Sequence, residues 1–187
     1  MGKFLTGVAR IQQTDKKRVW KVLDNELYMD DDGTIYLVPR NFYTDNYTIP
    51  TWIAWLGGSP VDNDVRGSHL HDLCCDCHSA IKVNLTTDEL LKLDLLRCKS
   101  KTGMWICENI PEQYLEIIPK TKKEANDLLY RCMKAAGSAK RDRYVTRAGV
   151  CFNIGWFIDK WQGKVFDIEL DKIYTEEFWR THVWYNY

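Results

Sequence analysis

The chain is organised around the stretch Ser68-His69-Leu70-His71-Asp72-Leu73-Cys74-Cys75-Asp76-Cys77-His78. This stretch holds three of the four histidines and three of the seven cysteines of the chain. In a helix, side chains at i, i+3, i+4 and i+7 lie on one face. Four residues share that face here: His71, Cys74, Cys75 and His78. His71 and Asp72 would point about 100° apart and meet different neighbours. The stretch is therefore either a chemical site or a polar patch on a core helix.

The length of 187 residues fits a single domain. We divide it into a β-rich part with a loop (1–50), a helical part (51–160) and an aromatic tail (161–187). The formal net charge is zero, so the overall charge indicates neither a nucleic-acid partner nor an anionic membrane. No apolar run has the length of a transmembrane segment. The odd number of cysteines and their irregular spacing predict reduced thiols in a cytosolic compartment.

Antiparallel β structure is predicted before residue 40. Two β-rich runs, 27–29 and 34–38, flank the turn Asp30-Asp31-Asp32-Gly33, and an Asp-Gly turn of this kind indicates a hairpin. Further along the chain, residues 104–106 and 114–118 are predicted to form a second strand pair. The aromatic tail is expected to fold back on the body, because so many exposed aromatic side chains would promote aggregation.

Helices are predicted after the β-rich part. The first covers 61 to about 80 and carries the His-Asp stretch. Two capping boxes open further helices, Thr86 with Glu89 and Thr121 with Glu124, and Gly137 ends the second of these. A fourth helix is predicted over 141–161. The fold class is therefore α+β, with an N-terminal antiparallel sheet packed against a bundle of three to four helices.

Three blocks of the chain, in order, resemble a family of small tailed-phage and prophage proteins of unassigned function. The blocks are Leu37-Val38-Pro39-x-x-Phe42-x-Thr44-Asp45-x-x-Thr48-Ile49-Pro50, then His71-Asp72, then Asp127-x-x-Tyr130 followed by Met133-Lys134-Ala135-Ala136-Gly137. The family reads roughly V-P-x-G-F-x-T-D-x-x-S-x-P, H-D-x-x-Y and A-D-x-x-F, and the resemblance covers about 18–160. Three positions depart from it: Asn41 replaces Gly, Cys75 replaces Tyr, and Asn126 precedes the later Asp. The resemblance implies a protein of the host cytoplasm or of the virion, with other virion proteins as partners.

The second and third blocks also resemble phospholipases A2 over residues 56–133. Those enzymes carry a Gly-rich calcium loop, then H-D-x-C-Y on a helix, then an Asp on a second helix. Here Gly57 and Gly58 precede His71-Asp72-Leu73-Cys74, and Asp127 follows. The resemblance implies hydrolysis of a phospholipid or another ester. His71 would deprotonate water, and Asp127 would fix the tautomer of its imidazole.

The same resemblance implies a calcium ion as cofactor. Asp72 and the backbone carbonyls of Gly57 and Gly58 would supply the oxygen ligands that Ca²⁺ prefers. The ion would polarise the ester carbonyl and stabilise the developing oxyanion. Four other residues are expected around the same pocket: Asp45, Thr44, Tyr130 and Trp55. For Asp45, hydrogen bonding that closes its own loop is the alternative.

Two classes of function stay open. The first is a phage-encoded, phospholipase A2-like hydrolase. The second is a non-enzymatic virion or tail accessory protein, or a binder of a host factor. In it, His71 and Asp127 would pair as a structural hydrogen bond between two helices, and the aromatic tail would be an interface.

Two kinds of metal site have partial sequence signals in this stretch. A phosphohydrolase site needs a separate upstream histidine, and His69 lies only two residues before His71. A zinc site at Cys74 and Cys77 would need a second cysteine pair at a suitable spacing. The alternative is that these cysteines are small apolar residues of a packed face.

Overall fold

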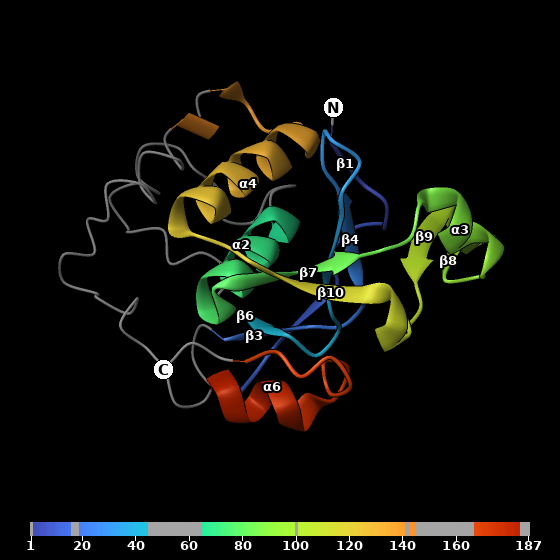
Figure 1. Cartoon of the computed structure of the whole chain (residues 1–187). Coiled ribbons are helices and arrows are strands. Elements are labelled where there is room, and N and C mark those ends of the chain that lie inside the picture. Colours follow the sequence, from blue (N-terminus) through green and yellow to red (C-terminus); the bar gives the residue numbers. More distant parts are fainter. Residues whose placement is uncertain are drawn as a thin grey trace.

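The computed structural model describes residues 2–15, 19–44, 65–99, 101–140, 143–144 and 167–183. Within these ranges antiparallel sheets pack against helices (Figure 1), so the predicted α+β class and the N-terminal antiparallel sheet are confirmed. Several sequence expectations fall on residues outside the described ranges. They concern Asp45, Trp55, Gly57, Gly58 and most of the helix predicted over 141–161.

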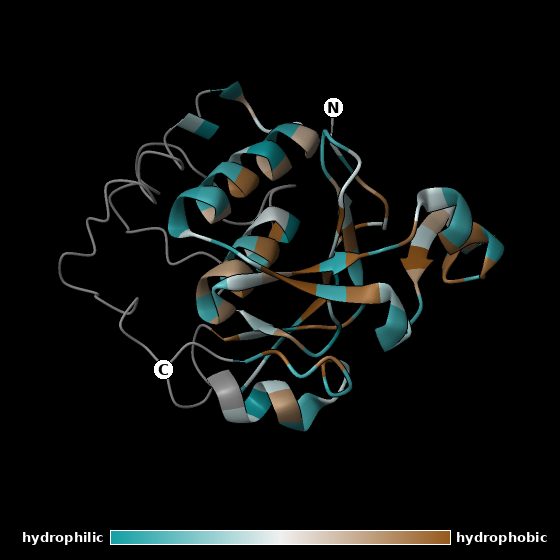
Figure 2. Cartoon of the chain, in the orientation of Figure 1, coloured by the Kyte–Doolittle hydropathy of each residue, from teal (hydrophilic) through white to brown (hydrophobic). Residues whose placement is uncertain are grey.

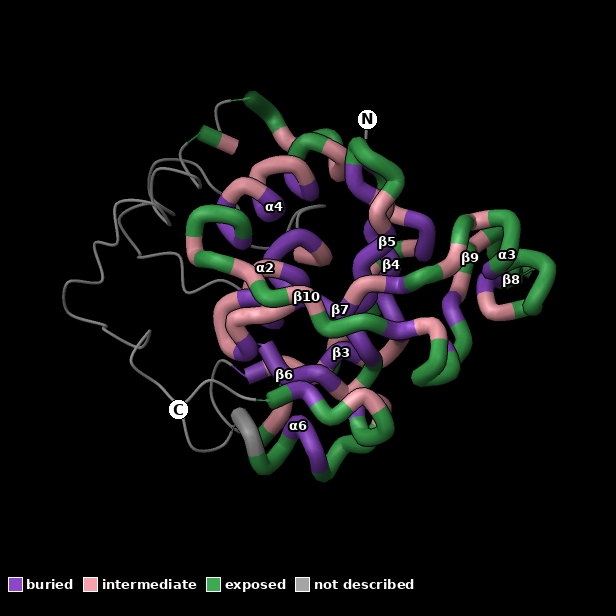
Figure 3. The backbone as a smooth tube through the Cα atoms, in the orientation of Figure 1, coloured by how far each residue is buried: buried purple, intermediate pink, exposed green. Residues whose placement is uncertain are grey.

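The central sheet has five antiparallel strands. In spatial order they are β1 (Lys3–Phe4), β4 (Glu26–Met29), β5 (Ile35–Val38), β7 (Ser79–Val83) and β10 (Leu115–Pro119). A three-stranded sheet is formed by β2 (Ile11–Gln13), β3 (Trp20–Val22) and β6 (Tyr43–Thr44). A separate hairpin is formed by β8 (Leu96–Lys99) and β9 (Met104–Cys107). The strands at the middle of the large sheet are buried, whereas β10 is largely exposed (Figure 3).

The predicted first hairpin is confirmed as β4 and β5. Met29 lies opposite Ile35, and Leu27 lies opposite Leu37. Gly33 has a φ of 86°, a conformation in the turn that glycine adopts without strain. This hairpin brings the fully buried side chains of Leu27 and Leu37 into the core.

The helices cover the sheets from different sides. They are α2 (Val65–Cys77), α3 (Thr87–Lys92), α4 (Lys122–Ala135) and α6 (Glu176–Val183), with a short 3-10 helix, η1 (Glu112–Tyr114). α2 packs against β5 and β7 and is covered in turn by α4 (Figure 1). Hydrophobic and hydrophilic residues alternate along α4, as expected for a helix with one buried face (Figure 2). Projecting from the body is a side lobe, made of α3, β8 and β9.

Both predicted capping boxes are present. The side-chain oxygens of Thr86 and Thr121 each accept a hydrogen bond from the backbone N–H of the glutamate three residues later. The carboxylate of that glutamate accepts a hydrogen bond from the backbone N–H of the threonine. After α4, Gly137 has a φ of 84° and ends the helix as predicted. α2 ends a few residues earlier than predicted, because His78 adopts a φ of 49° and the chain then enters β7.

The predicted pairing of strands 104–106 and 114–118 is wrong. β9 pairs with β8, and β10 pairs with β7. Both strands exist close to the predicted positions, but their partners were missed. The sequence of a strand predicts its pairing partner poorly, because pairing depends on the side chains of the neighbouring strands and helices.

The described part of the tail folds back on the body, as predicted. Trp179 is 1% exposed, and its indole N–H donates to the Ile173 carbonyl at 2.6 Å. Its ring lies edge-on to Phe42 and Phe178, at centroid distances of 5.1 and 4.8 Å. α6 is thereby fixed beside β6.

Candidate functional site

The approach of α2 to α4 depends on a small residue. A Cβ added at Gly67 would lie 3.0 Å from the Cβ of Cys132 on α4. Because glycine has no side chain, the two helices can pack this closely. The approach sets the face of α2 that carries His71 against the face of α4 that carries Asn126.

His71 contacts α4 through its Nε2 atom. Nε2 donates to the Asn126 side-chain oxygen at 2.9 Å, and Asn126 is 4% exposed. The residue of α4 that contacts His71 is thus Asn126, one position before the expected Asp127. Consecutive residues of a helix point about 100° apart, so Asn126 and Asp127 face different neighbours.

Asp72 links the same histidine to the three-stranded sheet. The hydroxyl of Thr44, at the end of β6, donates to Asp72 Oδ2. Asp72 Oδ1 lies 3.7 Å from His71 Nδ1, an ion-pair distance. The His71 side chain is 15% exposed and the Asp72 side chain 17% exposed, so both reach the surface. Thr44 and Asp72 therefore hold the imidazole from the side opposite Asn126.

Cys75 completes the group. It lies one helical turn after His71, and its Sγ is 3.5 Å from Nε2 and 3.8 Å from Nδ1 of the imidazole. This is the i, i+4 contact expected on one helix face. We call Thr44, His71, Asp72, Cys75 and Asn126 the His71 cluster. It joins β6, α2 and α4.

The cluster changes the protonation of His71. Burial by itself lowers the pKa of the imidazole, but its electrostatic and hydrogen-bonding interactions with Cys75 and Asp72 outweigh burial. The pKa of His71 therefore lies well above its ordinary value of 6.5. At neutral pH the imidazolium form is favoured, which fits a histidine held between two acceptors.

The sequence had indicated three cluster residues: His71, Asp72 and Thr44. It did not identify Asn126 and Cys75 as site residues, although the position of each in the sequence indicated that it could lie near His71. Cys75 stands at i+4 from His71, and Asn126 directly precedes the expected aspartate.

The other two described candidates lie on α4. Asp127 and Tyr130 are both half-buried. Tyr130 is near two residues that follow the helix. Its ring centroid is 5.9 Å from that of Tyr144 and 5.8 Å from the Arg143 guanidinium carbon. Within the described ranges, His, Cys, Asp and Glu form no group of three or more that could hold a metal ion.

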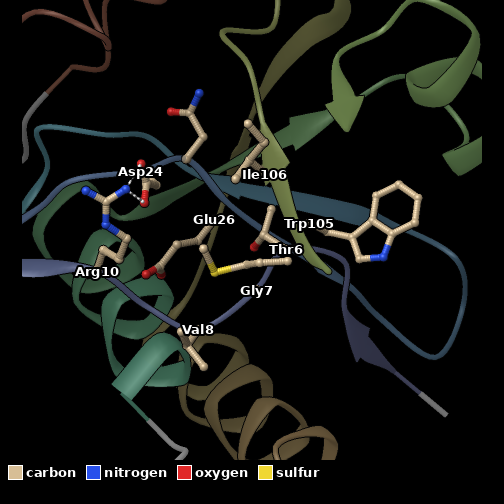
Figure 4. Close-up of a pocket in the computed structure, with 10 residues that line it drawn as sticks. Thr6, Gly7, Val8, Arg10, Asp24, Glu26, Trp105 and Ile106 are labelled. Carbon is tan, nitrogen blue, oxygen red and sulfur yellow. Dashed lines mark hydrogen bonds and ion pairs between the residues drawn. The ribbon is translucent and has the colours of Figure 1, made fainter. Parts of the chain in front are cut away.

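A small pocket lies elsewhere, beside Glu26 (Figure 4). Its cavity volume is about 10 Å³, room for about one water molecule. The Glu26 carboxylate pairs with His69, at 2.9 Å from Oε2 to Nδ1, and the two side chains are 6% and 0% exposed. This buried pair ties α2 to β4. The pocket has no lining residue from the His71 cluster, and its size excludes an organic substrate.

The fold and the cluster define an α+β protein with a half-buried polar group between two helices and a short strand. The chain belongs to the family described as "Protein of unknown function (DUF1353)", which matches residues 20–150. That range includes the whole His71 cluster. No curated protein and no solved structure matches the chain. In the described part of the chain, no helix is long and apolar enough to cross a membrane.

Proposed function

We propose that this protein is a phage-encoded ester hydrolase in which His71 transfers the proton, as the phospholipase A2 resemblance implies. The observation that carries the proposal is the 2.9 Å contact between His71 Nε2 and the Asn126 oxygen. A histidine that donates through one nitrogen has its other nitrogen free to exchange a proton. In this chain that second nitrogen is Nδ1, which lies 3.7 Å from Asp72 Oδ1. Cys75 Sγ lies beside both ring nitrogens, at 3.5 Å from Nε2 and 3.8 Å from Nδ1.

In this proposal Asn126 is a positioning residue. Its amide oxygen would keep the proton of the neutral imidazole on Nε2, the role predicted for Asp127. An amide would do this without adding negative charge, so it stabilises the imidazolium less than a carboxylate would. Thr44 and Asp72 would limit rotation of the ring from the other side.

Calcium stays a prediction for this protein. Asp72 Oδ2 accepts a hydrogen bond from Thr44, and Oδ1 faces His71, so the side-chain contacts support a role in holding the imidazole. The predicted carbonyl ligands, Gly57 and Gly58, lie outside the described residues. We therefore assign no metal ligand among the described residues and include calcium as a variable in the assay.

The test is ester release from two kinds of substrate, a soluble p-nitrophenyl ester and mixed phospholipid vesicles, each with calcium or with chelator. Hydrolysis should depend on His71 and be lost in His71→Ala. Asn126→Ala should lower the rate about 10-fold or more, in line with loss of an orienting group. Asp127→Asn is the matched control and should retain the rate. Equal rates for the wild type and His71→Ala, or no hydrolysis of either substrate, would refute the proposal.

A second candidate function is a non-enzymatic binder of a virion protein or host factor. The observation in its favour is that three large apolar side chains of the side lobe are exposed: Leu91 by 41%, Leu93 by 48% and Trp105 by 41%. The His71 cluster would then only join helices and strand. The aromatic residues of α6 offer less to a partner, because Phe178 and Trp179 are buried. This function would be favoured if the wild type hydrolyses no ester and if Trp105→Ser loses binding to virion proteins.

A further inference from the structure

We propose that Cys75 is the nucleophile of the His71 cluster and accepts the acyl group of an ester substrate as a thioester. The substrate class rests on the proposed function, but the reactivity of the thiol does not.

The geometry supplies each part of an activated thiol. Cys75 Sγ lies 3.5 and 3.8 Å from the two imidazole nitrogens of His71. A histidine in contact with a cysteine accepts its proton, and the resulting imidazolium stabilises the thiolate. Asn126 orients the base from α4, and Asp72 lies on the side of Nδ1. Nucleophile, base and orienting group are thus all present, on two packed helices.

The preferred protonation state of His71 agrees with this arrangement. A histidine paired with a thiolate carries a proton in the resting state, and the pKa of His71 is raised well above 6.5. At neutral pH that histidine is protonated. A thiolate beside an imidazolium is the resting state that a cysteine nucleophile requires.

Other cysteines in the described part of the chain are in different environments. Burial raises the pKa of the Cys74, Cys77 and Cys132 thiols well above their ordinary value of 9.0, so these groups stay protonated and inert. Cys98 is exposed on β8 and serves as a reference thiol. Cys75 is half-buried and in contact with an imidazole, which sets it apart from both kinds.

The reaction would proceed in two balanced steps. The thiolate of Cys75 attacks the ester carbonyl carbon, an S–C bond forms, and the C–O bond to the alcohol breaks. The departing oxygen takes the proton from His71 Nδ1 and leaves as the alcohol. Water then attacks the thioester and gives a proton to His71, the C–S bond breaks, and the carboxylic acid leaves. Thiolate and imidazolium are restored, and water is the only co-reactant.

Thiol alkylation tests the reactivity of Cys75 without any enzyme activity. The folded protein is treated with iodoacetamide at pH 6.5, and each cysteine is followed by peptide mass spectrometry. Only about 1% of an ordinary thiol is in the thiolate form at this pH. A thiolate with a lowered pKa is less nucleophilic than an ordinary thiolate, which offsets part of its higher population. We expect Cys75 to react about 10-fold or more faster than Cys98, and His71→Gln to remove this advantage. Protection of Cys74 and Cys132 confirms that the variant is folded.

Acylation tests the nucleophile itself. The wild type is mixed with p-nitrophenyl acetate and quenched in acid, and the acetyl group should be found on Cys75. Cys75→Ala should lose both the acetyl group and hydrolysis, whereas Cys98→Ala should retain both. If Cys75→Ala hydrolyses esters at the wild-type rate, the inference fails and the proposed hydrolase stands. If Cys75 is acetylated without turnover, the hydrolase fails and the nucleophile stands. Alkylation of Cys75 no faster than that of Cys98 overturns the inference.

Discussion

The contact between His71 and Asn126 makes a quantitative prediction about the packing of α2 on α4. We consider the single variants His71→Ala and Asn126→Ala and the double variant. Their coupling energy isolates the contact from the rest of each side chain. The cycle is run at about pH 6, where His71 is in its charged form.

The expected magnitude follows from burial and charge. A hydrogen bond to a charged group contributes about 1.5–3 kcal/mol to stability. His71 is 15% exposed and Asn126 is 4% exposed, so solvent screens the bond only partly. We expect a coupling energy of about 1–2 kcal/mol. Asn126→Ala alone should cost about 2 kcal/mol, because it leaves the Nε2 donor without this acceptor.

The assay is equilibrium urea unfolding followed by tryptophan fluorescence, with one transition midpoint and slope for each variant. The control cycle pairs His71→Ala with Asp127→Ala, one residue further along α4. Its coupling energy should stay below about 0.5 kcal/mol. A coupling to Asp127 larger than the coupling to Asn126 would refute the assignment of the second-helix partner, and with it the positioning role given to Asn126.

Three further predictions concern the packing around the site. Gly67→Val should destabilise the fold by about 1–3 kcal/mol, because the valine side chain would collide with Cys132 on α4. Chemical unfolding measures the change, and an unchanged transition midpoint would contradict the close approach of the two helices. Trp179→Ala should cost about 3–5 kcal/mol, since a side chain only 1% exposed is removed from the core, and a loss below about 1 kcal/mol by the same measurement would show that α6 is not packed as described. The raised pKa of His71 makes its contribution to stability complete below the unfolded-state value of 6.5 and lost as pH rises through the folded-state pKa. The free energy of unfolding of the wild type minus that of His71→Gln should therefore fall with increasing pH, and a difference that is constant or rises would contradict the ion pair.

Local features of the fold were readable from the sequence. The Asp-Gly turn predicted the β4–β5 hairpin, and the two Thr-x-x-Glu boxes marked the starts of α3 and α4. Each of these signals acts within a few residues. Turn conformations and helix caps depend on neighbouring backbone groups, so the sequence alone is sufficient to indicate them.

The partners of each element were decided by the tertiary structure. β9 and β10 lie close to their predicted positions but pair with β8 and β7, and α2 ends early where the chain enters β7. The same holds at the site. His71 and Asp72 stood out in the sequence, whereas the predicted partner on the second helix was Asp127 and the observed one is Asn126. Helix spacing predicts which residues share a face, but the rotation of α4 against α2 is set by packing, at Gly67 and Cys132 among other positions. That rotation decides which of two adjacent side chains reaches the imidazole.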